Sequence, residues 1–211
     1  MPDRHVPPGA GGNADAAKAP DAHSSDDPYR YRRGWSGRAR LSATNRLRVV
    51  TEDKSGLLPV AEAAAEVIRK ILVARRVSVT LLEGDEYRDL VNVGDLAPDQ
   101  ARFPKGQRYP TSDYPATTAS LRVNRGYIST SGDLDVVREY IALSPRPTFG
   151  CFMGVPIIAF GAVQGEVFAT RDPHDPVFLD EDMEVARDLA TSFGTRLPDL
   201  VRQQHIDDPS W

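Results

Sequence analysis

The sequence predicts an α+β domain in which an antiparallel sheet is flanked by helices. Two amphipathic helical segments enclose two pairs of strand-like runs. Each pair of runs is separated by only two turn-forming residues, which is typical of an antiparallel hairpin. Helices placed before and after such hairpins lie outside the sheet.

The composition limits the classes of protein to which the chain can belong. It has 211 residues, 40% of them hydrophobic and 27% charged, with a formal net charge of -4. This balance is typical of one globular domain with tails. No apolar run approaches the roughly 20 residues that a membrane span needs, and the first residues do not form a secretory signal. The lone cysteine, Cys151, excludes an internal disulfide and a multi-cysteine metal cluster. We therefore expect a cytoplasmic protein without membrane contact.

Four segments divide the chain. Residues 1–40 are rich in Pro, Gly, Ala, Asp and Ser with few aliphatic side chains, and this predicts a disordered arm. Residues 41–52 are expected to be a linker or short helix, residues 53–197 the domain, and residues 198–211 a C-terminal tail. Within the arm, the basic stretch Arg30 to Arg40 fits either a contact strip for RNA, an acidic partner or an anionic surface, or a solvated arm. The acidic balance of the whole chain argues against nucleic acid.

An amphipathic helix opens the domain. Ser55 can cap its start, and Pro59 is tolerated because it falls near the first turn. The apolar residues that recur at three- and four-residue steps are Leu57, Val60, Ala64, Val67, Ile68 and Ile71. Strands are predicted over 77–83 and 86–94, joined by a Gly-Asp turn.

A long polar stretch follows, from Asp95 to about Thr118, and it contains four prolines. Connections of this length are usually binding loops or lids. A short helix is expected over 116–124, a short strand over 126–130, and a further helix that Asp133 can cap.

The clearest hairpin joins residues 149–160 to 163–171. Pro156 cannot donate a ladder hydrogen bond, so we expect a bulge or an unpaired edge there. A closing helix follows, with Asp180 as its expected cap and Pro198 at its end.

Three stretches resemble the GAF domains of bacterial signalling proteins. They are the C-terminal CFMGVPIIAFGAVQGEVFATRDPHDPVFLDEDMEVARDLATSFG, the central RYPTSDYPATTASLRVNRGYIST, and the opening helix with its VSVTLLE hairpin. The resemblance implies a six-stranded antiparallel sheet of GAF/PAS-like type, with helices on one face and a pocket on the other. GAF domains bind small molecules or dimerise, usually in front of an output domain. No such domain is visible here, so we expect signalling through a partner protein or dimerisation.

The residue chemistry does not indicate catalysis. GAF-fold free methionine sulfoxide reductases depend on several cysteines, so Cys151 is expected to be a core thiol, and a redox enzyme is the weakest hypothesis. The four histidines lie in tails or in a proline-rich connection, which argues against haem. No spacing typical of a metal site occurs, and no cofactor is expected.

A ligand site is predicted where the long loop crosses the sheet. Aromatic walls and polar groups would come from the loop and the following helix, above a floor on the central strand. The candidate residues are Tyr109, Asp113, Tyr114, Thr117, Thr118, Leu121, Cys151 and Met153. The alternative is that Tyr109 and Tyr114 simply fill the space over the sheet.

Two functions remain open from the sequence. The first is a single-domain sensor that binds a small molecule and signals through a partner. The second is a ligand-free interaction or dimerisation module whose own side chains fill the pocket. A homodimer is expected because Val185 and Leu189 make the apolar stripe of the closing helix wider than one contact requires.

Overall fold

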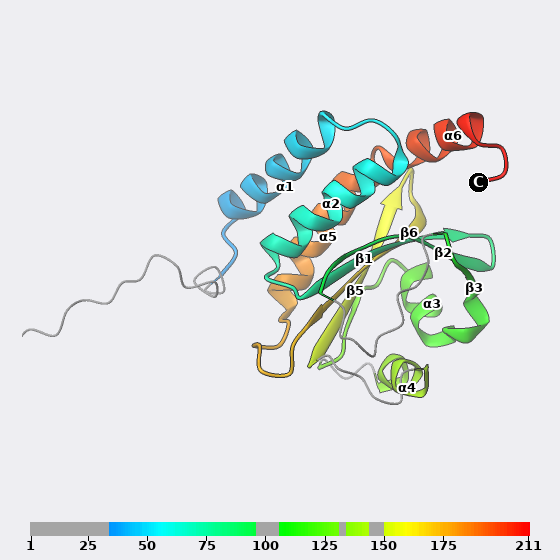
Figure 1. The fold of residues 1–211 in the computed structure, drawn as a ribbon. Helices are drawn as coiled ribbons and strands as arrows, with labels where there is room; N and C mark the ends of the chain where they lie inside the picture. Colours follow the sequence, from blue (N-terminus) through cyan, green and yellow to red (C-terminus); the bar gives the residue numbers. More distant parts are fainter. Residues whose placement is uncertain (1–33, 96–105, 131–133, 144–149) are drawn as a thin grey trace, which may run out of the picture.

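The computed structural model describes residues 34–95, 106–130, 134–143 and 150–211. Its centre is a six-stranded antiparallel sheet of order β3-β2-β1-β6-β5-β4. Three helices, α1, α2 and α5, lie on one side of the sheet, and α3 and α4 lie on the other (Figure 1). The predicted α+β class and the six-stranded sheet are confirmed.

The elements have the following bounds. The strands are β1 Arg76–Glu83, β2 Glu86–Gly94, β3 Arg108–Pro110, β4 Tyr127–Ile128, β5 Cys151–Ala159 and β6 Ala162–Arg171. The α-helices are α1 Gly37–Glu52, α2 Leu57–Ile71, α3 Pro115–Arg122, α4 Leu134–Leu143, α5 Asp180–Gly194 and α6 Leu197–Asp207, and a 3-10 turn, η2, covers Thr111–Asp113.

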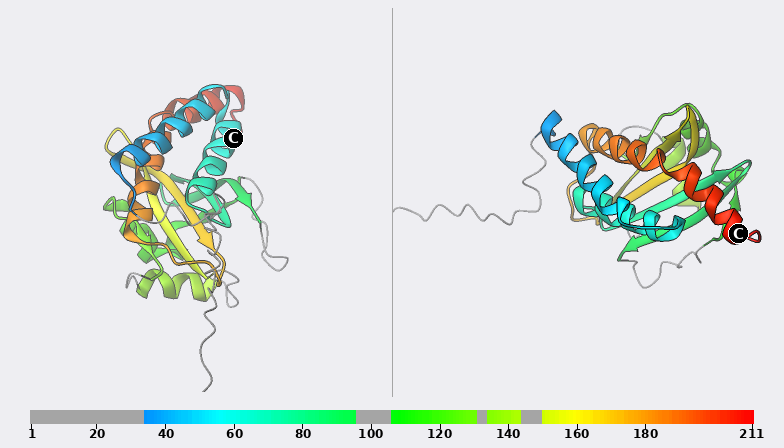
Figure 2. Two further views of the ribbon diagram at one scale, coloured as in Figure 1. Left: turned by 90° about the vertical axis from the view of Figure 1, so that its left-hand side faces the viewer. Right: turned by 90° about the horizontal axis from the view of Figure 1, so that it is seen from above.

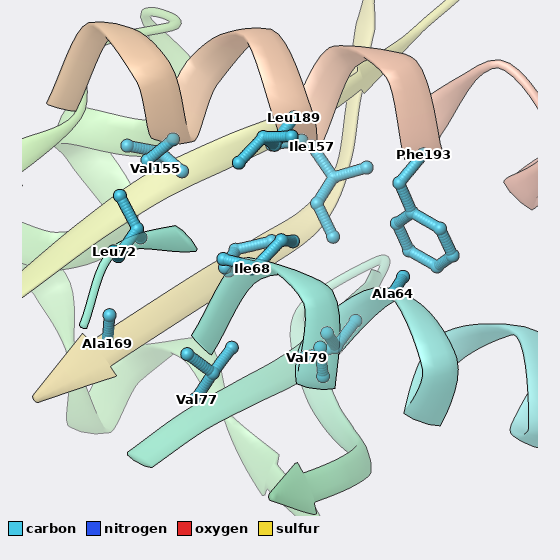
Figure 3. Packing of buried hydrophobic residues seen from close by; sticks show 14 of the residues in the cluster. Ala64, Ile68, Leu72, Val77, Val79, Val155, Ile157, Ala169, Leu189 and Phe193 are labelled. Atoms are coloured by element: carbon cyan, nitrogen blue, oxygen red, sulfur yellow. The ribbon is translucent and has the colours of Figure 1, made fainter. Parts of the chain in front are cut away.

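The main core lies between the sheet and the helices α2 and α5. Ile68 of α2 and Leu189 of α5 are fully buried there, facing Val79 and Ile157 of the sheet (Figure 3). The expected apolar stripe of α2 supplies one wall of this core. Burying such a large aliphatic surface is the main driving force for the fold.

Helix α1 is longer than the sequence predicted and is part of the packed domain. It begins at Gly37, inside the segment expected to be disordered, because the Ser36 hydroxyl caps the amide of Ala39 at 3.2 Å. It lies beside α2 and α5 (Figure 2), and Leu47 on its inner side is buried. This packing was not predicted because the strongly basic composition of the segment hides a narrow apolar stripe.

Helix α1 covers part of α5, and this changes the interpretation of the wide apolar stripe on α5. Val185 and Leu189, the residues that made the α5 stripe wide, are both fully buried. On its outer edge, Arg40 of α1 forms ion pairs with Glu184 and Asp188 of α5, at 2.6 and 2.7 Å. The extra width of the stripe therefore serves packing within one chain, and it no longer supports a dimer.

The expected C-terminal tail also folds. Pro198 stands in the first turn of α6, where its missing N–H costs nothing, rather than simply ending α5. Beyond α6, the indole of Trp211 packs on the guanidinium group of Arg88, which lies 3.5 Å from the ring centroid. A cation–π contact of this kind ties the end of the described chain to β2.

Two predicted helix caps are wrong. Gly56, not Ser55, precedes α2, and it has no side-chain cap. At α5 the cap position is Leu179 instead of Asp180, and the carboxylate of Asp182 accepts the Leu179 amide at 3.1 Å. In both cases the observed cap position lies one residue from the predicted one.

The strand register shifts at two places in the sheet, and the first shift determines which side Asp89 faces. Between Val79 and Thr80 the β1–β2 register shifts, so Leu90 is an extra residue that stays on the core side with Val91, and Asp89 faces the opposite side. The bulge expected at Pro156 occurs one residue later, between Ile157 and Ile158.

Candidate functional site

The sheet face that points away from α2 and α5 is covered by aromatic rings, and we call it the tyrosine face. Its rings belong to Tyr87, Tyr109, Tyr114, Tyr127, Tyr140, Phe152 and Phe168. Neighbouring ring centroids lie 4.7 to 6.4 Å apart. These distances are typical of mutually packed aromatic side chains.

Two buried acids lie in the sheet beneath these rings. Thr80 of β1 pairs with Asp89 of β2 on one side and with Glu166 of β6 on the other. The exposed fractions of Asp89 and Glu166 are only 4% and 5%. Strand alternation thus brings two carboxyl groups to the centre of the tyrosine face, on either side of one threonine.

Glu166 is the more isolated of the two acids. The hydroxyl of Tyr127 donates a hydrogen bond to it, and the Tyr140 hydroxyl lies 3.0 Å from that of Tyr127. Within the described chain no lysine, arginine or histidine forms an ion pair with Glu166. Burial raises the pKa of Glu166 to about 7, against the opposing effect of the Tyr127 hydrogen bond, and the nearby Asp89 raises it further.

Asp89 has more polar partners. Its carboxylate accepts hydrogen bonds from the hydroxyl groups of Thr80 and Tyr109, each at 3.1 Å. Burial raises the pKa of Asp89, while these bonds and the charge of Arg76 act in the opposite direction. The Arg76 guanidinium in turn donates to the Asn92 side chain at 2.6 Å.

Helix α3 is fixed to the sheet through Thr118. Its hydroxyl lies 2.8 Å from the hydroxyl of Tyr87 and donates to the backbone carbonyl of Thr111 at 3.3 Å. Leu121, one turn further along, is fully buried in the same aromatic cluster. Both residues therefore lie under α3 at the tyrosine face.

Helix α4 is connected to α3 and to the sheet by two adjacent residues. The Glu139 carboxylate accepts hydrogen bonds from the amides of Ala116 and Thr117 and from the Thr117 hydroxyl. A carboxylate at this position satisfies amides that the first turn of α3 leaves unpaired. The ring of Tyr140 stacks on Phe168, with centroids 5.0 Å apart and planes 12° apart.

The structure brings only part of the predicted site together. Tyr109, Tyr114, Thr118 and Leu121 meet on the tyrosine face. Thr117 is buried, and its hydroxyl is bound by Glu139. By contrast, Asp113 is exposed on η2.

The predicted floor of the site is wrong. Cys151 and Met153 do share one side of β5, but that side belongs to the core beneath α2 and α5. Phe152, with the opposite orientation, faces the tyrosine cluster. The alternation was predicted correctly, but without the positions of the helices the sequence did not show which side was which.

Four important residues of the face were not predicted: Asp89, Tyr127, Tyr140 and Glu166. For Glu166 a signal was present, because a lone acid in the middle of the apolar run VQGEVFATR is unusual for a central strand. Gly154 was a second signal. A Cβ atom there would collide with the Glu166 carboxyl and the Tyr127 ring, so this glycine makes room for the pair.

Metal-ligand clusters and membrane-spanning helices are both absent from the described residues. Among them, no three His, Cys, Asp or Glu side chains gather at a distance suited to a metal ion. No helix in the described ranges is both long and apolar enough to cross a membrane.

Comparison with known proteins identifies the family and the fold. The family model described as GAF domain matches residues 56–197. A GAF domain from an Acinetobacter phosphoenolpyruvate-protein phosphotransferase has a TM-score of 0.60 and 15% identity, over 81% of this chain and 96% of that chain. The corresponding domain from Coxiella burnetii has a TM-score of 0.59 and 13% identity, with the same coverage.

A chromophore-binding domain is also similar. The chromophore-binding domain of a bacteriophytochrome from R. palustris has a TM-score of 0.56 and 16% identity, over 79% of this chain. The match spans 62% of that longer chain. No curated protein sequence matches this chain. At these identities the likeness to solved structures shows the fold alone.

Proposed function

This chain belongs to the GAF domain family, and we propose that it is a sensory or regulatory protein that binds a small molecule at the tyrosine face. In this proposal the chain binds and signals and does not catalyse. It acts in the cytoplasm and passes its signal to a partner protein.

The observation that carries the proposal is Glu166. A carboxyl group with 5% exposure, in the middle of a sheet and without an ion pair among the described residues, is costly to fold. An apolar side chain at this position would pack the same space at lower cost. Buried groups with perturbed pKa values gather at functional sites, which supports a role in binding.

The arrangement around Glu166 also supports a sensor. Hydrogen bonds link Glu166 to Tyr127 and onward to Tyr140 on α4, whose neighbour Glu139 holds the start of α3. A molecule that contacts this chain of bonds changes how both helices sit on the sheet. A bound state that differs in the position of α3 and α4 is what a partner would recognise.

A thermal-shift screen of small molecules tests the proposal. It uses the wild-type chain, Glu166→Leu, which removes the buried acid, and Glu181→Gln, a control that removes an exposed acid on α5. We expect at least one compound to raise the Tm of the wild type and of the control but not of Glu166→Leu. Compounds that stabilise all three proteins equally bind elsewhere, and a screen without hits contradicts the proposal.

The second candidate function is a ligand-free interaction or dimerisation module. The close packing of the rings favours it, because Tyr114 and Tyr140 occupy the space in which a ligand would lie. A homodimer belongs to this candidate, with Leu41 and Val49 on the outer side of α1 as its exposed apolar residues. Light scattering that gives twice the chain mass, lowered to one chain mass in Leu41→Asp, would favour it.

A redox enzyme has less support than either candidate. Cys151 has 1% exposure and lies in the core beneath the helices, on the side of the sheet opposite the tyrosine face. Thiols that react are partly exposed and lie near positive charge.

A further inference from the structure

We infer that the molecule bound at the tyrosine face is an organic cation whose ammonium group takes the place now filled by the ring of Tyr114. This inference rests on the proposed function and names the chemical class of the ligand. It follows from the geometry of the rings, from the charges beneath them and from the way Tyr114 is held.

The rings around Tyr114 have the spacing of a cation cage. The centroid of the Tyr114 ring lies 5.4 Å from that of Tyr109, 6.0 Å from that of Tyr140 and 6.1 Å from that of Tyr87. A cation is attracted to an aromatic ring when it lies within about 6 Å of the centroid. An ammonium group at the Tyr114 position therefore meets this condition with three tyrosines at once. A methylated ammonium group is also close to a phenyl ring in size.

The charges beneath the rings favour a positively charged ligand. Asp89 and Glu166 are both buried in the floor. Burial raises the pKa of Tyr114 above them, and the negative charges of Asp89 and Glu166 raise it further. Arg76 acts most strongly on Asp89 and less strongly on Tyr109 and Tyr140, while Arg122 acts on Tyr87. Glu166 has no such partner within the described chain. A cation would supply the missing charge, whereas an anion would add repulsion in a place of low dielectric constant.

Tyr114 is the ring that is free to leave. The hydroxyl groups of Tyr87, Tyr109, Tyr127 and Tyr140 all hydrogen-bond to other side chains. Among the described residues none makes such a bond to the Tyr114 hydroxyl. Tyr114 is also half-buried and stands between η2 and α3, so a change of side-chain rotamer moves its ring without breaking a strand or a helix.

Binding of a cation is coupled to the release of a proton from Glu166. The titratable groups that act on Glu166 are Asp89 of β2, Tyr127 of β4 and Tyr140 of α4, together with Tyr87, Tyr109 and Tyr114, and Arg76 of β1 acts on Asp89. The tyrosines stay protonated in this pH range, since burial raises their pKa. A cation near Glu166 favours the carboxylate, so Glu166 gives its proton to the solvent. Affinity for the cation should therefore increase as the pH rises from about 6 to about 8.

Isothermal titration of the full chain with a pair of matched probes tests the inference. The probes are choline and its neutral isostere 3,3-dimethylbutan-1-ol (dimethylbutanol below), in which a carbon atom replaces the quaternary nitrogen. Both are titrated into the wild type and into Tyr114→Ala, which vacates the cage. We expect choline to bind at least tenfold more tightly than dimethylbutanol in both proteins, and Tyr114→Ala to bind choline more tightly than the wild type. Because the wild type is measured too, the result does not depend on folding of the variant.

The proton is measured in the same experiment. In buffers of different ionisation enthalpy, choline binding at about pH 7 should release a fraction of one proton. Glu166→Gln should lose this release and most of the preference for choline. Glu181→Gln, which removes an exposed acid, should keep both.

The possible outcomes separate the inference from the proposed function. Equal binding of the two probes, or tighter binding of dimethylbutanol, overturns the cation class and leaves a small-molecule site in place. If neither probe binds, the inference fails, and hits from the thermal-shift screen that depend on Glu166 would still support the proposed function. If both experiments give no binding, both proposals fail.

Discussion

The hydroxyl of Tyr127 donates a hydrogen bond to the buried carboxyl group of Glu166, and the missing side chain of Gly154 is what lets them meet. Tyr127 pairs with Gly154 across β4 and β5, and Gly154 pairs with Phe168 of β6. The glycine thus lies directly beneath the contact. Its role is steric rather than conformational, since a Cβ atom here would overlap both partners.

We predict that Gly154→Ala destabilises the protein by about 2 to 3 kcal/mol, because the added methyl group displaces the Tyr127 ring or the Glu166 carboxyl. Urea denaturation measures the change. Gly37→Ala is the matched control, since a Cβ there meets nothing within 4 Å. Equal stability of Gly154→Ala and the wild type would show that the two side chains do not occupy the positions described.

The pKa of Glu166 predicts how stability depends on pH. Burial places its pKa in the folded protein at about 7, above the ordinary value of 4.5 that applies to the unfolded chain. The folded state therefore binds more protons between these values, and the stability that this provides is lost as the pH rises through about 7. The loss is on the order of 3 kcal/mol. Asp89, whose pKa is also raised, acts in the same direction.

Glu166→Gln tests this dependence. The variant should be more stable than the wild type at about pH 8, and its free energy of unfolding should vary less between about pH 5 and about pH 8. Urea titrations at several pH values give both quantities. A wild-type stability that rises with pH over this window would mean that Glu166 is ionised in the folded state throughout.

Glu139 is predicted to hold α3 and α4 together. Glu139→Ala removes the acceptor for the amides of Ala116 and Thr117, and it should cost about 1 to 2 kcal/mol. Hydrogen exchange should become faster at these two amides in particular. Asp135→Ala on the same helix is the control, because Asp135 is exposed and pairs only with Arg138 among the described residues. Unchanged exchange in Glu139→Ala would refute this role.

The packing of α1 gives a further prediction. Leu47 has 1% exposure and Leu41 has 62%, although both lie on the same helix. Leu47→Ala should destabilise the domain by about 2 to 4 kcal/mol, whereas Leu41→Ala should change stability little. Urea denaturation compares them. Similar small effects would mean that α1 is the loosely attached linker that the sequence suggested.

The fold was largely predictable because its signals are local. The apolar period of α2 and the two-residue turns of the hairpins depend on neighbours in the chain. The helix and the first turn were found where they were expected, and the second turn lies one residue earlier than expected, at Phe160 and Gly161. Helix α1 was missed for the opposite reason. The narrow stripe that includes Leu47 has meaning only when α5 is present to cover it, and nothing near it in the sequence indicates that contact.

The candidate site was less predictable because it is assembled from distant strands. Tyr109 and Tyr114 were identified from a loop of unusual length, which is a local signal. Asp89 and Glu166 are 77 positions apart, and they meet through Thr80 only after the sheet has formed. Cys151 and Phe152 were assigned to the wrong sides of the sheet for a similar reason. Strand alternation fixes which residues share a side, but it does not show which side is buried under the helices.

The central claim is that the tyrosine face holds a small molecule, and native mass spectrometry of the protein purified without denaturation tests it most directly. The account predicts that the wild-type chain carries a bound species of defined mass, and that Glu166→Leu, purified in parallel, carries none. The same species bound to both proteins would place it elsewhere on the molecule. A wild-type chain found entirely at its own mass, and left unchanged by every compound of the thermal-shift screen, would contradict the account.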